Sequence, residues 1–161
     1  KLISKWLKVA FNDPENIKAR GGMLIGSCFA GVAFMKGLGL VHSISHMIGA
    51  EYNTQHGLTN AIILPPVMRF NLPHVGKKVR FISDAMDLKE ASSDLVVKEI
   101  EKILDYVDIP KSLSEIGIPL ECKKRIAEKA MLDSATGTNP RAAQIEDVEK
   151  LTEISILSAR A

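Results

Sequence analysis

The chain has 161 residues, of which 46% are apolar and 25% charged, a composition typical of one soluble globular domain with a real core. Its 21 basic and 19 acidic residues give a net charge of +2, so composition offers no electrostatic case for a nucleic-acid or anionic-membrane partner. Two cysteines are too few for a disulfide framework, and we therefore expect a cytoplasmic protein.

The N-terminal part of the chain predicts two helices. Residues 1–11 place apolar side chains on one helical stripe, and Asp13 and Pro14 suit the N-cap and first position of a second helix that runs to about residue 35. No residue from Gly21 to Met35 is charged. This run is shorter than the roughly 18–20 residues needed to cross a bilayer, so we expect a buried central helix and no membrane partner.

The sequence Gly37-Leu38-Gly39 ends that helix and is a near miss for a dinucleotide-binding fingerprint. We reject the fingerprint because His42 stands where the third glycine belongs and because a helix, not a strand, precedes it. Six further helices are predicted over residues 40–50, 57–70, 75–86, 91–107, 120–132 and 145–158, with a turn-rich connector over 108–119. Since alternating strand patterns are absent, residues 1–161 are predicted to form a single all-α domain of seven to nine helices.

Three of the four histidines lie close together in sequence. His42 and His46 are four residues apart, which places them on the same face of a helix, and His56 follows ten residues later. Such imidazoles can bind a divalent metal, or can combine a metal ligand with an acid–base group. The set is incomplete, because iron and catalytic zinc usually take a carboxylate as well, and the neighbouring Glu51 could equally be a solvated turn residue. Histidines that are hydrogen-bonded in a core are the alternative.

A longer motif surrounds these histidines. It reads Gly37-Leu38-Gly39, His42, His46, Gly49, Tyr52, His56-Gly57, Asn60-Ala61, Leu64-Pro65, Val67 and Asn71, with Asn139-Pro140-Arg141 near the end of the chain. This pattern resembles the signature of the C-terminal helical domain of the iron-containing alcohol dehydrogenase family, and it spans nearly the whole chain. The resemblance implies a helical bundle domain of the dehydroquinate synthase-like type. Gln55 departs from the motif, because Pro commonly precedes this histidine.

The resemblance also implies roles for individual residues. His42 and His56 would bind the metal, which is Fe²⁺ or alternatively Zn²⁺, together with an Asp and a His from an upstream segment that this chain lacks. His46 would not be a ligand; it would lie beside the nicotinamide and relay the substrate proton as a catalytic residue. Phe34 matches, less closely, an aromatic residue that lines the substrate channel, although it could simply be a core aromatic.

The activity implied is that of a metal-dependent, NAD(P)-linked dehydrogenase that oxidises alcohols or reduces aldehydes by hydride transfer. NAD or NADP would bind mainly to an N-terminal domain absent from this chain, which begins at Lys1 rather than Met. We therefore expect the fragment alone to be inactive, to expose a face that docks on the missing domain, and to come from a homo-oligomer. A non-catalytic helical interaction or structural module, and a membrane-associated helical protein, are the alternatives from other classes.

Overall fold

The computed structural model describes residues 1–160, and within this range it contains eight α-helices, five short 3-10 helices and no strand. The α-helices are α1 (Leu2–Asn12), α2 (Ile17–Ala33), α3 (Leu40–Tyr52), α4 (His56–Asn71), α5 (Lys78–Ala85), α6 (Ser93–Tyr106), α7 (Lys123–Met131) and α8 (Ile145–Ser158). The all-α prediction is confirmed, and every predicted helix is present with ends that differ by a few residues.

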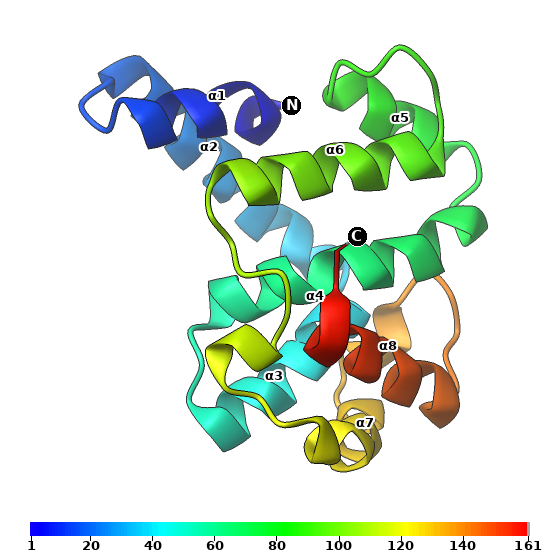
Figure 1. Ribbon diagram of the computed structural model, residues 1–161. Coiled ribbons are helices and arrows are strands. Elements are labelled where there is room, and N and C mark those ends of the chain that lie inside the picture. The colour runs from blue at the N-terminus through cyan, green and yellow to red at the C-terminus, as the bar shows by residue number, and fades with distance from the viewer. Residues whose placement is uncertain (161) are drawn as a thin grey trace.

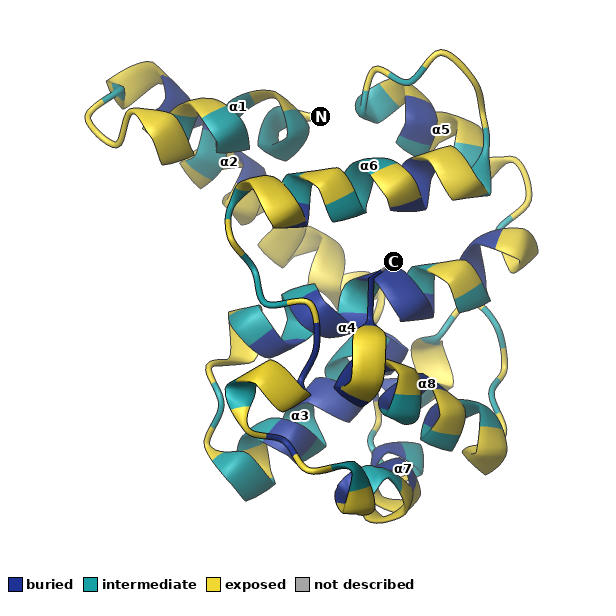
Figure 2. Ribbon diagram, in the orientation of Figure 1, coloured by how far each residue is buried: buried dark blue, intermediate teal, exposed yellow. Residues whose placement is uncertain are grey.

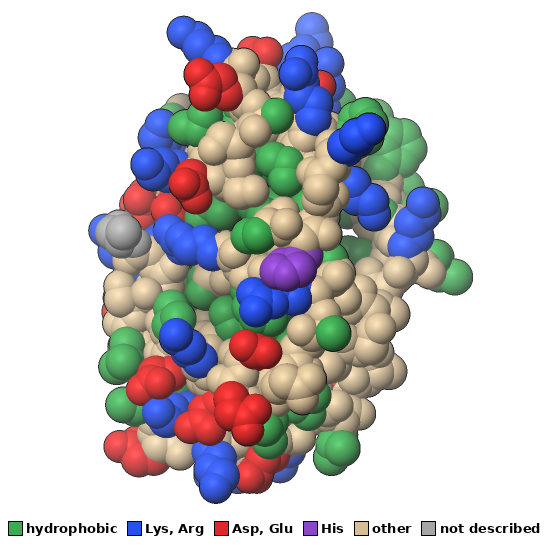
Figure 3. All heavy atoms as spheres, turned by 90° about the vertical axis from the view of Figure 1, so that its right-hand side faces the viewer, with side chains coloured by type: hydrophobic (Ala, Val, Ile, Leu, Met, Phe, Trp, Pro, Cys, Tyr) green, Lys and Arg blue, Asp and Glu red, His purple; other side chains and the backbone are tan. Residues whose placement is uncertain are grey.

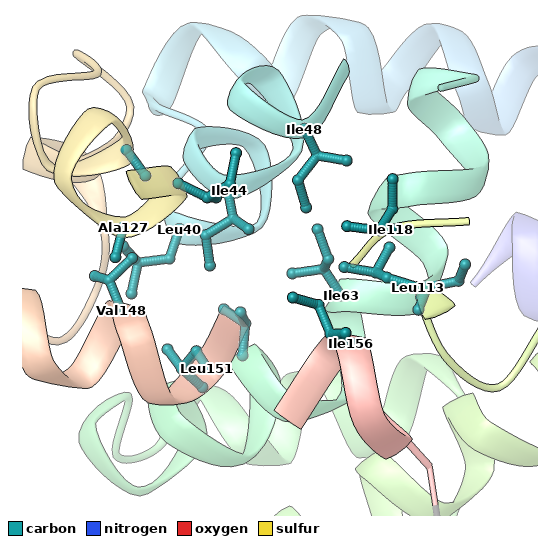
Figure 4. Close-up of a cluster of buried hydrophobic side chains, with 14 of the residues drawn as sticks. Leu40, Ile44, Ile48, Ile63, Leu113, Ile118, Ala127, Val148, Leu151 and Ile156 are labelled. Atoms are coloured by element: carbon teal, nitrogen blue, oxygen red, sulfur yellow. The ribbon is translucent and has the colours of Figure 1, made fainter. Parts of the chain in front are cut away.

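The main hydrophobic core lies among α3, α4, α7 and α8, in the lower half of Figure 1. The connector between α6 and α7 adds three buried side chains to it, those of Leu113, Ile118 and Cys122. Figure 4 shows its members pointing toward one another: Leu40, Ile44 and Ile48 from α3, Ile63 from α4, Leu113 and Ile118 from the connector, Ala127 from α7, and Val148, Leu151 and Ile156 from α8. Full burial of each large aliphatic side chain contributes about 1.5–3 kcal/mol, so this core firmly fixes α3 against α4.

A smaller hydrophobic cluster holds the upper half of the molecule together. Leu72, Val96 and Val97 form its buried centre, and side chains of α5 and α6 pack around them. In Figure 1, α6 lies across α4, and the hairpin of α1 and α2 projects at the upper left. The end of α1 contacts α6 through the rings of Phe11 and Tyr106, whose centroids are 6.1 Å apart.

The second helix starts one turn later than the sequence suggested. Its N-cap is Asn16, whose side-chain oxygen accepts a hydrogen bond from the Ala19 N–H at 3.0 Å, so the prediction of Asp13 as the cap is wrong. Asp13 instead caps the end of α1, where its backbone N–H donates to the Val9 carbonyl oxygen. Both residues are good cap formers, and the sequence pattern does not rank them.

The helix α2 is largely exposed (Figure 2), and the prediction of a buried central helix is wrong for the described residues. One of its faces packs tightly on α1: a Cβ atom at Gly22 would lie 2.2 Å from the Trp6 ring. Its exposed large apolar side chains, which we call the α2 apolar face, are Ile17, Leu24, Ile25, Phe29 and Val32. An apolar composition does not tell which element covers a helix, and here none of the described elements covers this face.

The helical run Ile17–Lys36 is long and apolar enough to cross a membrane when judged by length and composition alone, and 17% of its most apolar window is buried. A helix that packs against another part of a soluble protein passes the same test. Elsewhere the surface is mixed in charge: on the face shown in Figure 3, acidic and basic side chains alternate around small apolar areas.

Candidate metal centre

The helix α3 carries two of the three histidines, and its start is fixed by a side-chain cap from the far end of the chain. The Oδ1 atom of Asn139 accepts a hydrogen bond from the Leu40 N–H at 3.1 Å. Gly39 precedes this helix with φ +79°, a conformation that strongly favours glycine, and a Cβ atom there would also lie 2.9 Å from Asn139 Oδ1. From this start, the four-residue spacing brings the His42 and His46 rings to a centroid distance of 5.7 Å.

The third histidine enters the same cluster because it is the first residue of α4. Gln55 is the N-cap of that helix, and its side-chain oxygen accepts a hydrogen bond from the Leu58 N–H. A Pro at this position has no side-chain acceptor and could not cap the helix in this way. The ring of His56 lies 5.1 Å from that of His42 and 5.4 Å from that of His46, measured between centroids. One nitrogen from each of the three rings lies within 4.8 Å of the other two. The chain therefore folds so that all three imidazoles converge.

His42 is the histidine whose environment most disfavours a proton. Burial lowers its pKa below the ordinary value of 6.5, and the neighbouring His56 and His46 rings lower it further. Its Nδ1 atom is buried without a hydrogen-bond partner in the part of the chain that the structure describes. A neutral ring with an unused buried nitrogen is well suited to accept an electrophile such as a metal ion.

His56 is held by two polar neighbours. Its Nδ1 atom lies 3.1 Å from Ser45 Oγ, and its Nε2 atom lies 3.0 Å from the side-chain amide nitrogen of Asn60. Because an amide N–H can only donate, Nε2 is the acceptor and Nδ1 carries the proton that is donated to Ser45. A metal-binding histidine typically donates from one ring nitrogen to a neighbour in this way. A metal bound at Nε2 would take the place of the Asn60 N–H that this nitrogen accepts here.

His46 differs from the other two because a carboxylate faces it. Its Nδ1 atom lies 2.9 Å from Oδ2 of Asp133, which follows the end of α7. Sequence reasoning missed Asp133, since it stands 87 positions from His46 and no spacing rule connects them. Burial acts to raise the pKa of Asp133, but the Ala135 N–H and the His46 ring outweigh it and lower that pKa overall.

The aromatic residue predicted at the substrate pocket lies beside the cluster. Phe34 stands edge-on to His42 at a centroid distance of 5.4 Å, and 52% of its surface is exposed. It is therefore not a core aromatic in the described chain. Next to His42 there is also an open hollow of about 350 Å³, lined by Leu38, Val41, His42, Gly57, Asn60, Ala61 and Leu64.

Glu51 lies on α3, where it pairs with basic side chains and does not join the histidine cluster. It accepts hydrogen bonds from Arg125 at 2.9 and 3.0 Å and from Lys129 at 2.6 Å, which link α3 to α7. These contacts lower the pKa of Glu51, the hydrogen bond from Arg125 contributing most. Neither alternative for Glu51, a metal ligand or a solvated turn residue, is correct.

A scan against protein-family models matches residues 1–156 to the Fe-containing alcohol dehydrogenase family, C-terminal region. The chain belongs to this family. Among relatives of this alcohol dehydrogenase domain, lactaldehyde reductase of Escherichia coli K12 is 40% identical over 136 residues, which are 80% of this chain and 36% of that protein. The NAD-dependent methanol dehydrogenase of Bacillus methanolicus is 36% identical over 160 residues, or 94% of this chain and 42% of that protein.

Solved structures agree with this family assignment. A 1,3-propanediol oxidoreductase superimposes with a TM-score of 0.92 at 28% identity, and an alcohol dehydrogenase from Oenococcus oeni with a TM-score of 0.91 at 28% identity. In both cases the match covers 96% of this chain and 42% of the solved chain. The chain thus spans less than half the length of the proteins that it resembles.

The family's name implies an iron site, and the residues present fit part of one. The unpartnered buried nitrogen of His42 and the oriented ring of His56 supply two nitrogen donors of the kind that both iron and zinc accept. No carboxylate joins the three-histidine cluster among residues 1–160, since the carboxylate of Asp133 is engaged by His46 and Ala135. The donors identified here therefore make up an incomplete ligand set.

Proposed function

We propose that this chain is the C-terminal, metal-binding domain of a longer NAD(P)-linked alcohol dehydrogenase that oxidises small alcohols or reduces aldehydes. The observation that carries the proposal is the convergence of three imidazoles from α3 and α4 beside an exposed aromatic residue. Family membership supports the reaction class. Because the chain covers only 36–42% of the relatives described above, the remaining ligands and the nicotinamide site belong to the rest of the longer protein.

In this proposal His42 and His56 hold the metal, Fe²⁺ or alternatively Zn²⁺. Such an ion acts as a Lewis acid toward an alcohol or carbonyl oxygen and so favours hydride exchange with the nicotinamide. His42 is suited to the role because its pKa is lowered, and His56 because Ser45 holds its ring. Phe34 borders the substrate, since its exposed ring contacts that of His42.

His46 has a different task, which is to accept the hydroxyl proton of the alcohol. Its Nδ1 atom is already engaged by Asp133, which leaves Nε2 as the basic atom. A neutral imidazole is suited to this step because one of its nitrogens carries a lone pair that can accept a proton. We place the ring beside the nicotinamide of the bound NAD or NADP, which the N-terminal domain would hold.

The α2 apolar face is where we place the contact with the rest of the longer protein. Leu24 is 74% exposed and Val32 is 68% exposed, on a helix whose Gly22 and Gly26 pack on α1. An exposed apolar face of this kind marks an interaction surface. The full-length protein would be a cytoplasmic homo-oligomer.

The proposal is tested in the full-length protein with three alanine variants and one control. His42→Ala and His56→Ala are expected to lose bound metal and alcohol-dependent reduction of NAD or NADP. His46→Ala is expected to keep its metal and lose about 10²-fold or more in kcat, the range over which general acid–base groups act. His74→Ala is the control, because His74 lies outside the cluster.

A non-catalytic helical interaction module is the second candidate, and the α2 apolar face is the observation that favours it. That function predicts that metal content and activity are the same in His42→Ala, His56→Ala and the control. Such a result would contradict the dehydrogenase proposal.

A further inference from the structure

Asp133 contacts the histidine cluster from outside the signature motif. It lies just after α7, and its side chain is 14% exposed compared with 36% for that of His46. Its two oxygen atoms have different partners: Oδ2 faces His46 Nδ1 at 2.9 Å, and Oδ1 accepts the Ala135 N–H at 2.8 Å. The carboxylate is therefore held at both oxygens.

The turn that carries Asp133 is itself tied to α3. Thr136 Oγ1 lies 2.6 Å from the Ala130 carbonyl oxygen and 2.8 Å from Ser43 Oγ, and Ser43 is on the helix that carries His46. Thr138 Oγ1 donates to the Ala135 carbonyl oxygen at 2.9 Å. These bonds fix the distance between the carboxylate and the His46 ring.

The contact determines which nitrogen of His46 carries a proton. An ionised carboxylate can only accept hydrogen bonds, so Nδ1 must be the donor, and in the neutral ring Nε2 then keeps its lone pair. We propose that Asp133 is a positioning residue that holds His46 in the Nδ1-protonated form, with Nε2 free to accept the substrate proton. As the alcohol is oxidised, its C–H hydride would pass to the NAD⁺ or NADP⁺ held by the rest of the protein, which is thereby reduced. Its O–H bond breaks, and that proton forms a new N–H bond at Nε2. This proton transfer depends on the proposed dehydrogenase function, whereas the Nδ1-protonated form of His46 depends only on its contact with Asp133.

Replacement of Asp133 by asparagine reverses this arrangement for a geometric reason. The Ala135 N–H needs an oxygen at the Oδ1 position, because an NH₂ group there would face another donor. The amide NH₂ must then face His46 Nδ1, which becomes the acceptor. His46 is thereby forced into the form that is protonated at Nε2. In this form Nε2 has no free lone pair with which to accept the substrate proton.

The tautomer is measured by long-range ¹H–¹⁵N NMR on the chain of residues 1–161, labelled at histidine, with the pH raised until the ring ¹⁵N shifts of His46 no longer change. We expect His46 to be protonated at Nδ1 in the unmodified chain and at Nε2 in Asp133→Asn. Asp84→Asn makes the same chemical change in an exposed ion pair on α5 and is expected to leave His46 unaltered. An Nε2-protonated His46 in the unmodified chain overturns the inference even if the asparagine variant fails to fold.

Kinetics of the full-length protein provide the second measurement. Asp133→Asn is expected to lower kcat about 10²-fold while KM stays within about twofold and metal content is unchanged. Asp133→Glu, which keeps the carboxylate, is expected to recover part of this loss. Loss of metal equal to that of His42→Ala would instead assign Asp133 to the metal site and overturn the positioning role. Because the NMR result needs neither metal nor turnover, failure of the dehydrogenase proposal would not be confused with failure of this one.

Discussion

Three identical side chains acquire different chemical properties from their immediate neighbours. His42 is partly buried, and one of its nitrogens has no partner within residues 1–160. His56 donates to a hydroxyl group, whereas His46 donates to a carboxylate. The carboxylate can only accept, so the neutral His46 ring carries its proton at Nδ1 and its Nε2 atom can take up another. This difference in partners supports the separation of a proton-transfer role from two ligand roles.

The role of Ser45 is open to a direct test. Ser45→Ala removes the hydroxyl that orients His56, and we expect the affinity of the full-length protein for Zn²⁺ to fall about tenfold, as is usual for loss of a ligand's hydrogen-bond partner. Competition with a chromophoric chelator measures the change. Ser155→Ala, a buried serine on α8 that bonds to the Leu151 carbonyl oxygen, is the matched control. Equal affinities in the two variants would show that Ser45 does not support the ligand.

Among the elements, α3 and α4 are held together by Asn139, which lies in the segment between α7 and α8. Asn139 and Asn71 exchange side-chain hydrogen bonds of 2.7 and 2.9 Å, and Asn139 also accepts from the Leu40 N–H. One side chain thus joins the start of the histidine helix to the end of α4. Asn139 of the closing Asn-Pro-Arg motif therefore has a structural role.

Asn139→Ala is expected to destabilise the fold by about 2 kcal/mol, because it removes a helix cap and leaves Asn71 without its partner. Urea unfolding of the chain measures this free energy. If the two residues act as a pair, Asn71→Ala should cost much less in the Asn139→Ala background than it does alone. Additive losses would contradict the paired arrangement.

For the whole molecule, the α2 apolar face is a surface that none of the other described elements covers. Its side chains are exposed, whereas Gly22 and Gly26 of the same helix pack on α1. Such a surface favours association between copies of the chain.

We therefore expect the chain of residues 1–161 to self-associate, and the double variant Leu24→Glu, Val32→Glu to shift it toward monomer. Sedimentation velocity measures the distribution, and circular dichroism checks that helix content is retained. Phe81→Glu changes an exposed aromatic on α5 and should leave association unaltered. If the control and the double variant behave alike, the α2 apolar face is not the contact.

Sequence reasoning was strongest where contacts are local. Helical spacing predicted the shared face of His42 and His46, and the apolar periodicity predicted the helices. It failed where distant residues meet: nothing near His46 in sequence points to Asp133, and the partners of Glu51 lie more than seventy positions away. The burial of α2 was also mispredicted, because it depends on contacts with residues that are distant in sequence. An apolar composition shows that a helix can be buried but not which element covers it.

The central claim is that His42 and His56 hold one metal ion and that His46 does not. The most direct test is a crystal structure of the full-length protein loaded with Fe²⁺, with anomalous diffraction measured at the iron edge. We predict an anomalous peak about 2.1 Å from one nitrogen of His42 and one of His56, with His46 Nδ1 still on Asp133 and its Nε2 outside bonding distance. A peak bonded to His46, or the lack of a peak beside both His42 and His56, would contradict the account.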